Sequence, residues 1–176
     1  MTCGTVERYL NMGSAGDEIR ITFLQVEDWR EWRALRLAAL ADAPNAFSSR
    51  LEDWSGPADR EDRWRNRLAS IPFNAVATVN GIPAGMVGAT APSEGESELL
   101  SMWVAPAVRG KGVADALVEA VADWARRQGA ARLALDVREA NAHAIALYGR
   151  HGFQDVGPTP TSAGAPPERR MSRSLA

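Results

Sequence analysis

The pattern of apolar and polar positions in the first half of the chain predicts a strand, two helices and a hairpin. Residues 19–23 alternate apolar and polar side chains, which is typical of a strand with one buried face. Residues 27–40 carry apolar side chains at helical spacing, and Pro44 ends this helix because the residue before a proline avoids the helical conformation. Residues 57–69, rich in charge, predict a second helix. Asn80-Gly81 then joins two predicted strands, residues 73–79 and 82–90, as a hairpin.

The second half alternates strands with helices. Leu99 to Val104 is a short apolar run with one serine, which predicts a buried strand that Glu98 opens. From Val113 the apolar residues take helical spacing (Val113, Leu117, Val121 and Trp124 on one face) until Gln128-Gly129 ends the helix. A strand, a crossover helix and a further strand imply a parallel pair in the middle of the sheet. The remaining predicted elements are a strand over 132–137, a helix over 142–150, a strand from Phe153, a loop over 157–167 and a final edge strand over 169–175.

One domain accounts for this pattern. The chain has 176 residues, enough for a single hydrophobic core, and shows no internal repeat. Residues 1–17 are weakly patterned and contain three glycines, so we expect a mobile leader there and a single domain over 18–176.

Composition narrows the classes of function. The net charge of −2 argues against a general nucleic-acid binder, which carries a strong basic excess. The only cysteine is Cys3, so no internal disulfide can form, which fits a cytoplasmic protein. No apolar run approaches the ~20 residues of a membrane span, and no histidine or cysteine spacing is typical of a metal site. We therefore expect no metal cofactor, no nucleic acid and no membrane partner.

A basic, glycine-containing turn lies between the predicted strand and helix. Arg109, Gly110, Lys111 and Gly112 directly precede the first helical turn, whose N–H groups lack intrahelical partners. Those N–H groups, the helix dipole and two cations would suit a phosphate or diphosphate. The alternative is an ordinary tight connection with solvated basic residues. Neither a Walker A loop nor the dinucleotide-binding fingerprint is present.

The pattern Val104-x-Pro106-x-x-Arg109-Gly110-x-Gly112-x-Ala114 resembles motif A of the GNAT superfamily, the acetyl-CoA-dependent N-acetyltransferases. The resemblance covers residues 19–175 and is most specific over 98–153. It implies an α/β fold with a mixed, mostly antiparallel sheet, a splayed central parallel strand pair and flanking helices. It also implies acetyl-CoA as co-substrate. The pantetheine arm would contact the backbone of Met102, Trp103 and Val104, and the diphosphate would contact the backbone of Arg109, Gly110, Lys111, Gly112, Val113 and Ala114.

A second pattern indicates a proton donor. Asn141, Ala144 and Tyr148 share one face of the predicted helix by their spacing of three and four. Followed by Gly152-Phe153, this pattern resembles GNAT motif B. The resemblance implies that the Tyr148 hydroxyl protonates the leaving thiolate and that Asn141 contacts the cofactor. The alternatives are a core tyrosine and a helix N-cap asparagine.

Glu98 is the candidate base for deprotonating an amine. Alternation predicts that its side chain shares a face with Leu100, Met102 and Val104. Members of the family place a glutamate near this point, although others use water chains, and a solvated glutamate at a strand start is an equal alternative. His143 is expected to be exposed beside the motif B helix, and His151 to lie at the C-terminus of that helix.

These patterns together predict direct acetyl transfer to a primary amine in a ternary complex. An acetyl-cysteine intermediate is disfavoured because the one thiol lies in the leader. The alternatives are another acyl-CoA donor and a catalytically silent CoA-binding or regulatory module, which would need neither Glu98 nor Tyr148. Residues 36–47 resemble the GNAT segment that borders the acceptor, and Trp29, Trp32 or Trp54 could line its pocket. The acceptor class stays open between small-molecule and peptide amines, and a homodimer through the last strand stays open too.

Overall fold

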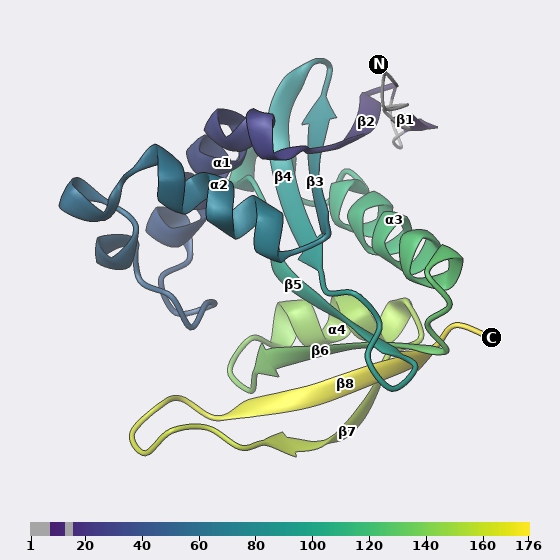
Figure 1. Ribbon diagram of the computed structural model, residues 1–176. Helices are drawn as coiled ribbons and strands as arrows, with labels where there is room; N and C mark the ends of the chain where they lie inside the picture. Colours follow the sequence, from purple (N-terminus) through teal and green to yellow (C-terminus); the bar gives the residue numbers. More distant parts are fainter. Residues whose placement is uncertain (1–7, 13–15) are drawn as a thin grey trace.

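One twisted sheet with helices on both faces forms the protein (Figure 1). The computed structural model describes residues 8–12 and 16–176. The strands are β1 (Arg8–Met12), β2 (Glu18–Phe23), β3 (Phe73–Val79), β4 (Ile82–Ala89), β5 (Glu96–Val104), β6 (Arg132–Arg138), β7 (Gln154–Thr159) and β8 (Glu168–Ser174). The helices are α1 (Trp29–Asp42), α2 (Glu61–Ser70), α3 (Val113–Arg127) and α4 (Ala142–Arg150). No described helix combines the length and the apolar character needed to cross a bilayer.

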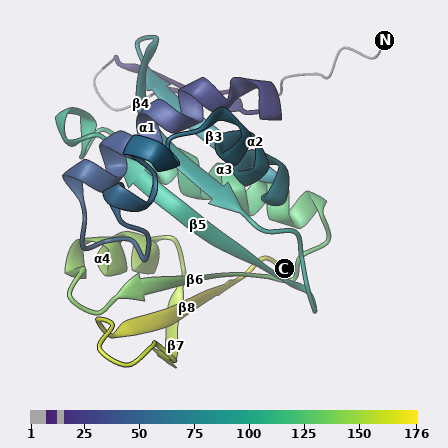
Figure 2. The ribbon, with the colours of Figure 1, turned by 60° about the vertical axis from the view of Figure 1, so that its left-hand side comes forward.

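The central strands β5 and β6 are parallel and part after a short contact. The sheet order is β1-β2-β3-β4-β5-β6-β8-β7, and every other neighbouring pair is antiparallel. β5 and β6 pair only from Glu96↔Arg132 to Glu98↔Ala134. Beyond Glu98 the two strands diverge, as Figure 2 shows. The predicted fold class, with its splayed parallel pair in a mostly antiparallel sheet, is confirmed.

Two apolar clusters cover opposite faces of the sheet. Alternation along β3 sends Ala75 and Ala77 into the cluster under α3 and α4, and Val76 into the cluster under α1 and α2. Gly85 on β4 lets α3 approach closely, because a Cβ there would lie 3.0 Å from Leu117 Cδ1. The predicted core face of α3 is confirmed, with Leu117 fully buried.

A bulge in β5 breaks the alternation that the sequence predicts. Met86 pairs with Trp103 and Gly88 with Leu100, so two residues of β5 oppose one residue of β4. Ser101 has a left-handed backbone, with φ +56°. As a result Met102 and Val104 pack in the α3/α4 cluster. Glu98 pairs with Arg170 on the opposite face, so its predicted common face with Met102 and Val104 is wrong.

The last strand is also placed differently from the prediction. β8 lies between β6 and β7 and is therefore internal, so the predicted edge strand is wrong. Residues 157–159 belong to β7 rather than to a loop. Pro158 suggests a loop in the sequence, but a proline is tolerated on an edge strand, which β7 is.

Two further differences concern the N-terminal half. The sequence predicts no strand before residue 19, whereas β1 pairs antiparallel with β2 within the expected leader. The rest of that leader, including Cys3, falls largely in residues 1–7 and 13–15, which lie outside the described residues. α2 begins at Glu61, since Pro57 lies in a separate 3-10 turn, Gly56–Ala58.

Candidate active site

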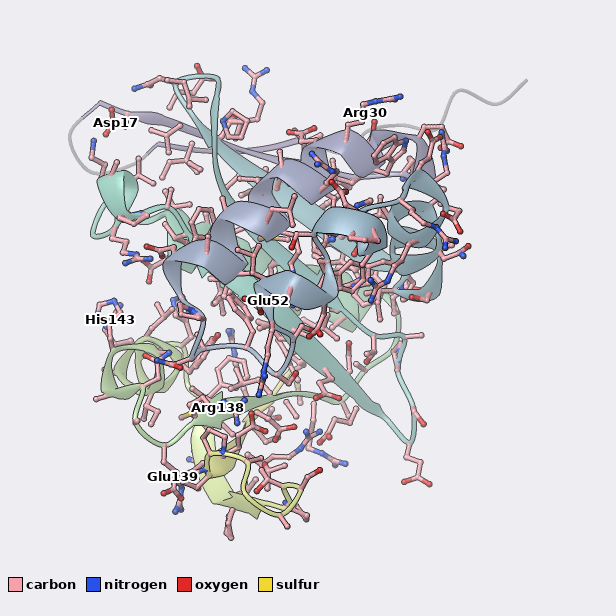
Figure 3. All side chains as sticks on the ribbon, turned by 90° about the vertical axis from the view of Figure 1, so that its left-hand side faces the viewer. Asp17, Arg30, Glu52, Arg138, Glu139 and His143 are labelled. Atoms are coloured by element: carbon pink, nitrogen blue, oxygen red, sulfur yellow. The ribbon has the colours of Figure 1, made fainter. Side chains whose placement is uncertain are left out.

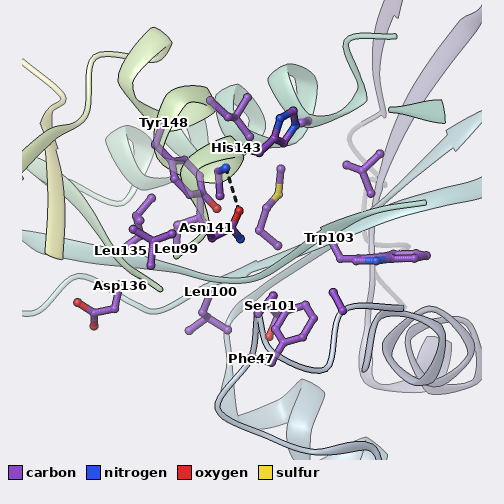
Figure 4. A pocket seen from close by; sticks show the side chains of 18 of the residues that line it. Phe47, Leu99, Leu100, Ser101, Trp103, Leu135, Asp136, Asn141, His143 and Tyr148 are labelled. Atoms are coloured by element: carbon purple, nitrogen blue, oxygen red, sulfur yellow. Dashed lines mark hydrogen bonds between the residues drawn. The ribbon is translucent and has the colours of Figure 1, made fainter. Parts of the chain in front are cut away.

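A pocket of about 930 Å³ lies where β5 and β6 separate. It is lined from both faces of the sheet, because the gap between the strands passes from one face to the other. Its walls come from α1, the segment between α1 and α2, α2, β5, the loop before α3 and the first turn of α3, β6, α4 and the start of β8; Figure 4 shows a part of this lining. Of the predicted site residues, all line this pocket except Lys111 and Val113, and Val113 is 1% exposed in the core.

The glycine turn before α3 offers backbone N–H groups to the pocket. Gly110 and Gly112 have φ of +79° and +88°, a conformation that glycine adopts readily. Gly112 is the N-cap of α3, so the amides of Val113 and Ala114 have no carbonyl one turn earlier to bind. This geometry, together with the helix dipole, can bind an anion.

The two cations of this turn bind carboxylates of the protein. Arg109 Nε donates to the Val104 carbonyl at 3.0 Å, and its Nη2 pairs with Asp42 at the end of α1. Trp103 Nε1 donates to the same Asp42 carboxylate at 2.9 Å, which lowers the pKa of Asp42. Lys111 Nζ lies 3.0 Å from Asp17 Oδ2. The amides of Arg109 and Lys111 also have partners, since they donate to the carbonyls of Pro106 and Val108 at 3.3 Å each, so the predicted diphosphate contact at these two amides is not supported. Among the described residues, the amides that the turn leaves without a partner are those of Gly110, Gly112, Val113 and Ala114.

Tyr148 and Asn141 enter the pocket from α4. The Tyr148 ring packs edge-on against Phe153 at 5.6 Å, and its hydroxyl points into the pocket (Figure 4). Burial raises the pKa of Tyr148, so the hydroxyl keeps its proton. Among the described residues no group hydrogen-bonds that hydroxyl. Asn141 Oδ1 accepts from the Ala144 amide at 3.1 Å, so Asn141 is the N-cap of α4 and also lines the pocket.

Glu98 enters the pocket from the other face, within a cluster of acids around one arginine. Arg170 lies 3.5 Å from Glu98, 2.6 Å from Glu96 and 3.0 Å from Asp136. Burial raises the pKa of Glu98; the Arg170 charge opposes this rise and the Asp136 charge adds to it. Asp136 lines the pocket and was missed in the sequence, although it is the one acid within the apolar strand β6.

The segment between α1 and α2 closes one side of the pocket. Of the three candidate tryptophans, Trp54 lines the pocket, whereas Trp29 and Trp32 lie in the α1/α2 cluster. Phe47 from the same segment also lines it. Two arginines also line the pocket: Arg36 begins the segment 36–47 that the sequence singled out, whereas Arg67 on α2 lies in no motif.

The two histidines have different environments. His143 is exposed and lines the pocket, as Figures 3 and 4 show. His151 contacts Asp115 Oδ1 at 2.7 Å and Glu119 Oε1 at 2.8 Å, which attaches the end of α4 to α3. No group of three or more His, Cys, Asp or Glu among the described residues could hold a metal ion.

A model of the acetyltransferase (GNAT) family matches residues 27–153. The chain belongs to this family. The match includes the glycine turn, both central strands and α4, so the GNAT resemblance of motifs A and B is confirmed.

Solved structures and curated relatives agree with the family. A GNAT acetyltransferase from Streptococcus pneumoniae shares the fold with a TM-score of 0.73 at 22% identity, over 90% of this chain and 100% of that one. Salmonella typhimurium yncA, solved with acetyl-CoA, has a TM-score of 0.68 at 21% identity, over 90% of this chain and 94% of that one. Streptothricin acetyltransferase from Streptomyces lavendulae is 48% identical over 54 residues, 31% of this GNAT chain and 29% of that relative. The chain thus spans less than a third of the length of the first curated relatives it matches.

Proposed function

We propose that the chain transfers an acetyl group from acetyl-CoA to a primary amine by direct attack in a ternary complex. The observation that carries this proposal is the gap between β5 and β6. It joins a helix N-terminus, a buried tyrosine hydroxyl and a half-buried carboxylate in one pocket. An acceptor and a donor that enter from opposite faces of the sheet would meet in this gap.

The donor fits the α3/α4 side of the gap. The amides of Gly110, Gly112, Val113 and Ala114 would bind the diphosphate. The edge of β5 that faces β6 has no strand partner beyond Glu98, so it can pair with the amides of a pantetheine arm as if with another strand. Asn141 would contact the donor through its free amide N–H₂, since its Oδ1 already caps α4. The side chains of Arg109 and Lys111 would bind the diphosphate only after they leave the carboxylates of Asp42 and Asp17.

The chemistry needs one base, one acid and an oxyanion site. Glu98 would take a proton from the ammonium, directly or through water, and burial raises its pKa, which makes it a stronger base than a solvated glutamate. The amine nitrogen then bonds to the thioester carbonyl carbon, and N–H groups of β5 near Met102 would stabilise the oxyanion. As the C–S bond breaks, Tyr148 would give its proton to the thiolate. The products are an N-acetyl amine and free CoA.

Three further assignments belong to the same proposal. Residues 18–176 form one acetyltransferase domain, and β1 adds an edge strand to its sheet. The chain works in the cytoplasm. The acceptor is a small-molecule or peptide amine, which fits the name of the S. lavendulae relative, streptothricin acetyltransferase.

The experiment is calorimetric titration with CoA followed by thiol release from acetyl-CoA with a panel of amines. We expect CoA binding, and thiol release that depends on an amine. CoA binding without thiol release for any amine or acyl-CoA would favour the silent binding module instead. Faster release from a longer acyl-CoA would favour another acyl donor.

A further inference from the structure

A buried arginine on the acceptor wall of the pocket lacks a counter-charge. Arg36 on α1 is 8% exposed and lines the pocket. Its guanidinium stacks on the Phe47 ring at 4.5 Å, and its buried Nη1 has no hydrogen-bond partner among the described residues. A buried cation without a partner is strongly unfavourable, and buried polar groups in proteins are nearly always paired. Arg33 on the same helix shows the usual arrangement, since it pairs with Asp59.

A second arginine lies on the same wall with neutral partners only. Arg67 on α2 donates to Asn74 Oδ1 and Ser101 Oγ, each at 3.2 Å, and lies over the Trp32 ring at 5.0 Å. Among the described residues no carboxylate lies within ion-pair distance of Arg36 or Arg67.

The two cations also act on each other. Burial lowers the pKa of both Arg36 and Arg67 to about 10, and the charge of Arg36 contributes to the lowering at Arg67. Both remain protonated at neutral pH. The wall therefore carries two desolvated positive charges that a bound anion would compensate.

We propose that Arg36 and Arg67 bind a carboxylate of the acceptor, so that the acceptor is a small amine that also carries a carboxylate, as a free amino acid does. This inference rests on the proposed acetyl transfer. Glu98 lines the same pocket, which would place the amine at Glu98 and the carboxylate at the arginines. A phosphate is a poorer fit, because it brings nearly two negative charges to a pocket that already contains the carboxylates of Glu98 and Asp136. Polyamines would add positive charge to the arginine wall.

The test compares free L-amino acids with their C-terminal amides, which keep the amine and side chain but remove the negative charge. Binding is followed by thermal unfolding of the full chain, with and without CoA, so that it does not depend on turnover. Thiol release from acetyl-CoA gives kcat/KM for each pair. The α-amino group of an amino-acid amide is less basic than that of the free amino acid and is more often unprotonated, so its reactivity alone would favour the amide. A preference for the free amino acid would therefore report recognition of its carboxylate.

The variant is Arg36→Met, which keeps the length and the apolar contact with Phe47 but removes the charge. Its matched control is Arg30→Met on the same helix; Arg30 is exposed and lies far from His143 at the pocket (Figure 3). We expect the acid-to-amide ratio of kcat/KM to fall by about 10- to 100-fold in Arg36→Met, the usual effect of losing a hydrogen bond between charged groups. The ratio should not change in Arg30→Met. The rise in Tm caused by the preferred acid should also disappear in Arg36→Met only.

Several results would overturn the carboxylate site. They are equal use of acids and amides by the wild-type chain, an unchanged ratio in Arg36→Met, no rise in Tm with any amino acid, or a preference for O-phosphoethanolamine over every amino acid. Thiol release with putrescine, but with no amino acid, would reject this site and leave acetyl transfer intact. Stabilisation by amino acids without any CoA binding would support the site and reject the proposed donor.

Discussion

Replacing Gly112 with alanine separates the strain of the glycine turn from its role in binding. Gly112 has φ +88° and caps α3 at the pocket. A Cβ at this position would meet no described atom closer than Ile19 Cδ1, at 3.9 Å. The variant therefore meets no steric clash within the protein, and its cost is the left-handed backbone of a non-glycine residue, about 1–2 kcal/mol.

Gly129, just after α3, provides the matched control. Its φ is +83° and a Cβ there would have no neighbour within 4 Å, so Gly129→Ala introduces the same strain at the opposite end of the same helix. Both variants should lower Tm without ligand by about 2–8 °C, at about 2–4 °C per kcal/mol for a chain of this size.

The two variants should differ only in their affinity for CoA. A methyl group at Gly112 stands beside the free amides of the turn and displaces a diphosphate from them. Losing one hydrogen bond to a charged group weakens binding by about 10- to 150-fold. Calorimetry should show this loss for Gly112→Ala and wild-type affinity for Gly129→Ala. Equal CoA affinity in Gly112→Ala and the wild type would refute the placement of the diphosphate, and so would an equal loss in both variants.

Three other predictions concern catalysis and stability. Tyr148→Phe should lower kcat by about 10- to 1,000-fold, in or near the range usual for a general acid, with CoA affinity unchanged by calorimetry; unchanged turnover would remove the hydroxyl from the reaction. Glu98 must be ionised to act as a base, so activity should fall as pH drops through its raised pKa. Glu98→Gln should abolish this acidic limb of the pH–rate profile, and Arg170→Gln should move the limb to higher pH because Arg170 lowers the pKa of Glu98. A limb that stays in place in Glu98→Gln would exclude that carboxylate. Leu117→Ala, at a fully buried position of α3, should reduce the free energy of unfolding in urea by about 2–5 kcal/mol, and a loss below 1 kcal/mol would contradict the packing of α3 on β4.

The elements that local chemistry specifies were predictable from the sequence. Asn80-Gly81 forms the predicted hairpin turn between β3 and β4, and α4 has the predicted bounds, Ala142–Arg150. Apolar periodicity identified the buried face of α3, because a helix repeats its faces over a few residues. The glycine turn and the residues of α4 could be found for the same reason, since each lies within one short motif.

What depends on distant residues could not be predicted in this way. The bulge at Ser101 reverses the faces of β5 relative to strict alternation, and it shows only in the register of β5 against β4. The position of β8 between β6 and β7 depends on pairing across the sheet. Arg109 pairs with Asp42, which lies 67 positions earlier in the chain, so the local sequence around Arg109 does not predict this contact. Arg36 looks like an ordinary charged position of an amphipathic helix until the fold buries it.

The short pairing of β5 with β6 has a consequence for how two substrates would enter the pocket and how the products would leave it. A sheet that closes on three residue pairs and then opens leaves a slot that is lined by residues from both faces of the sheet. If the proposed donor and acceptor enter this slot from different faces, neither would block the other, and either product could leave while the other is still bound. A change to Arg36, Phe47 or Trp54 could then alter which acceptor binds without disturbing the glycine turn and α4 across the slot.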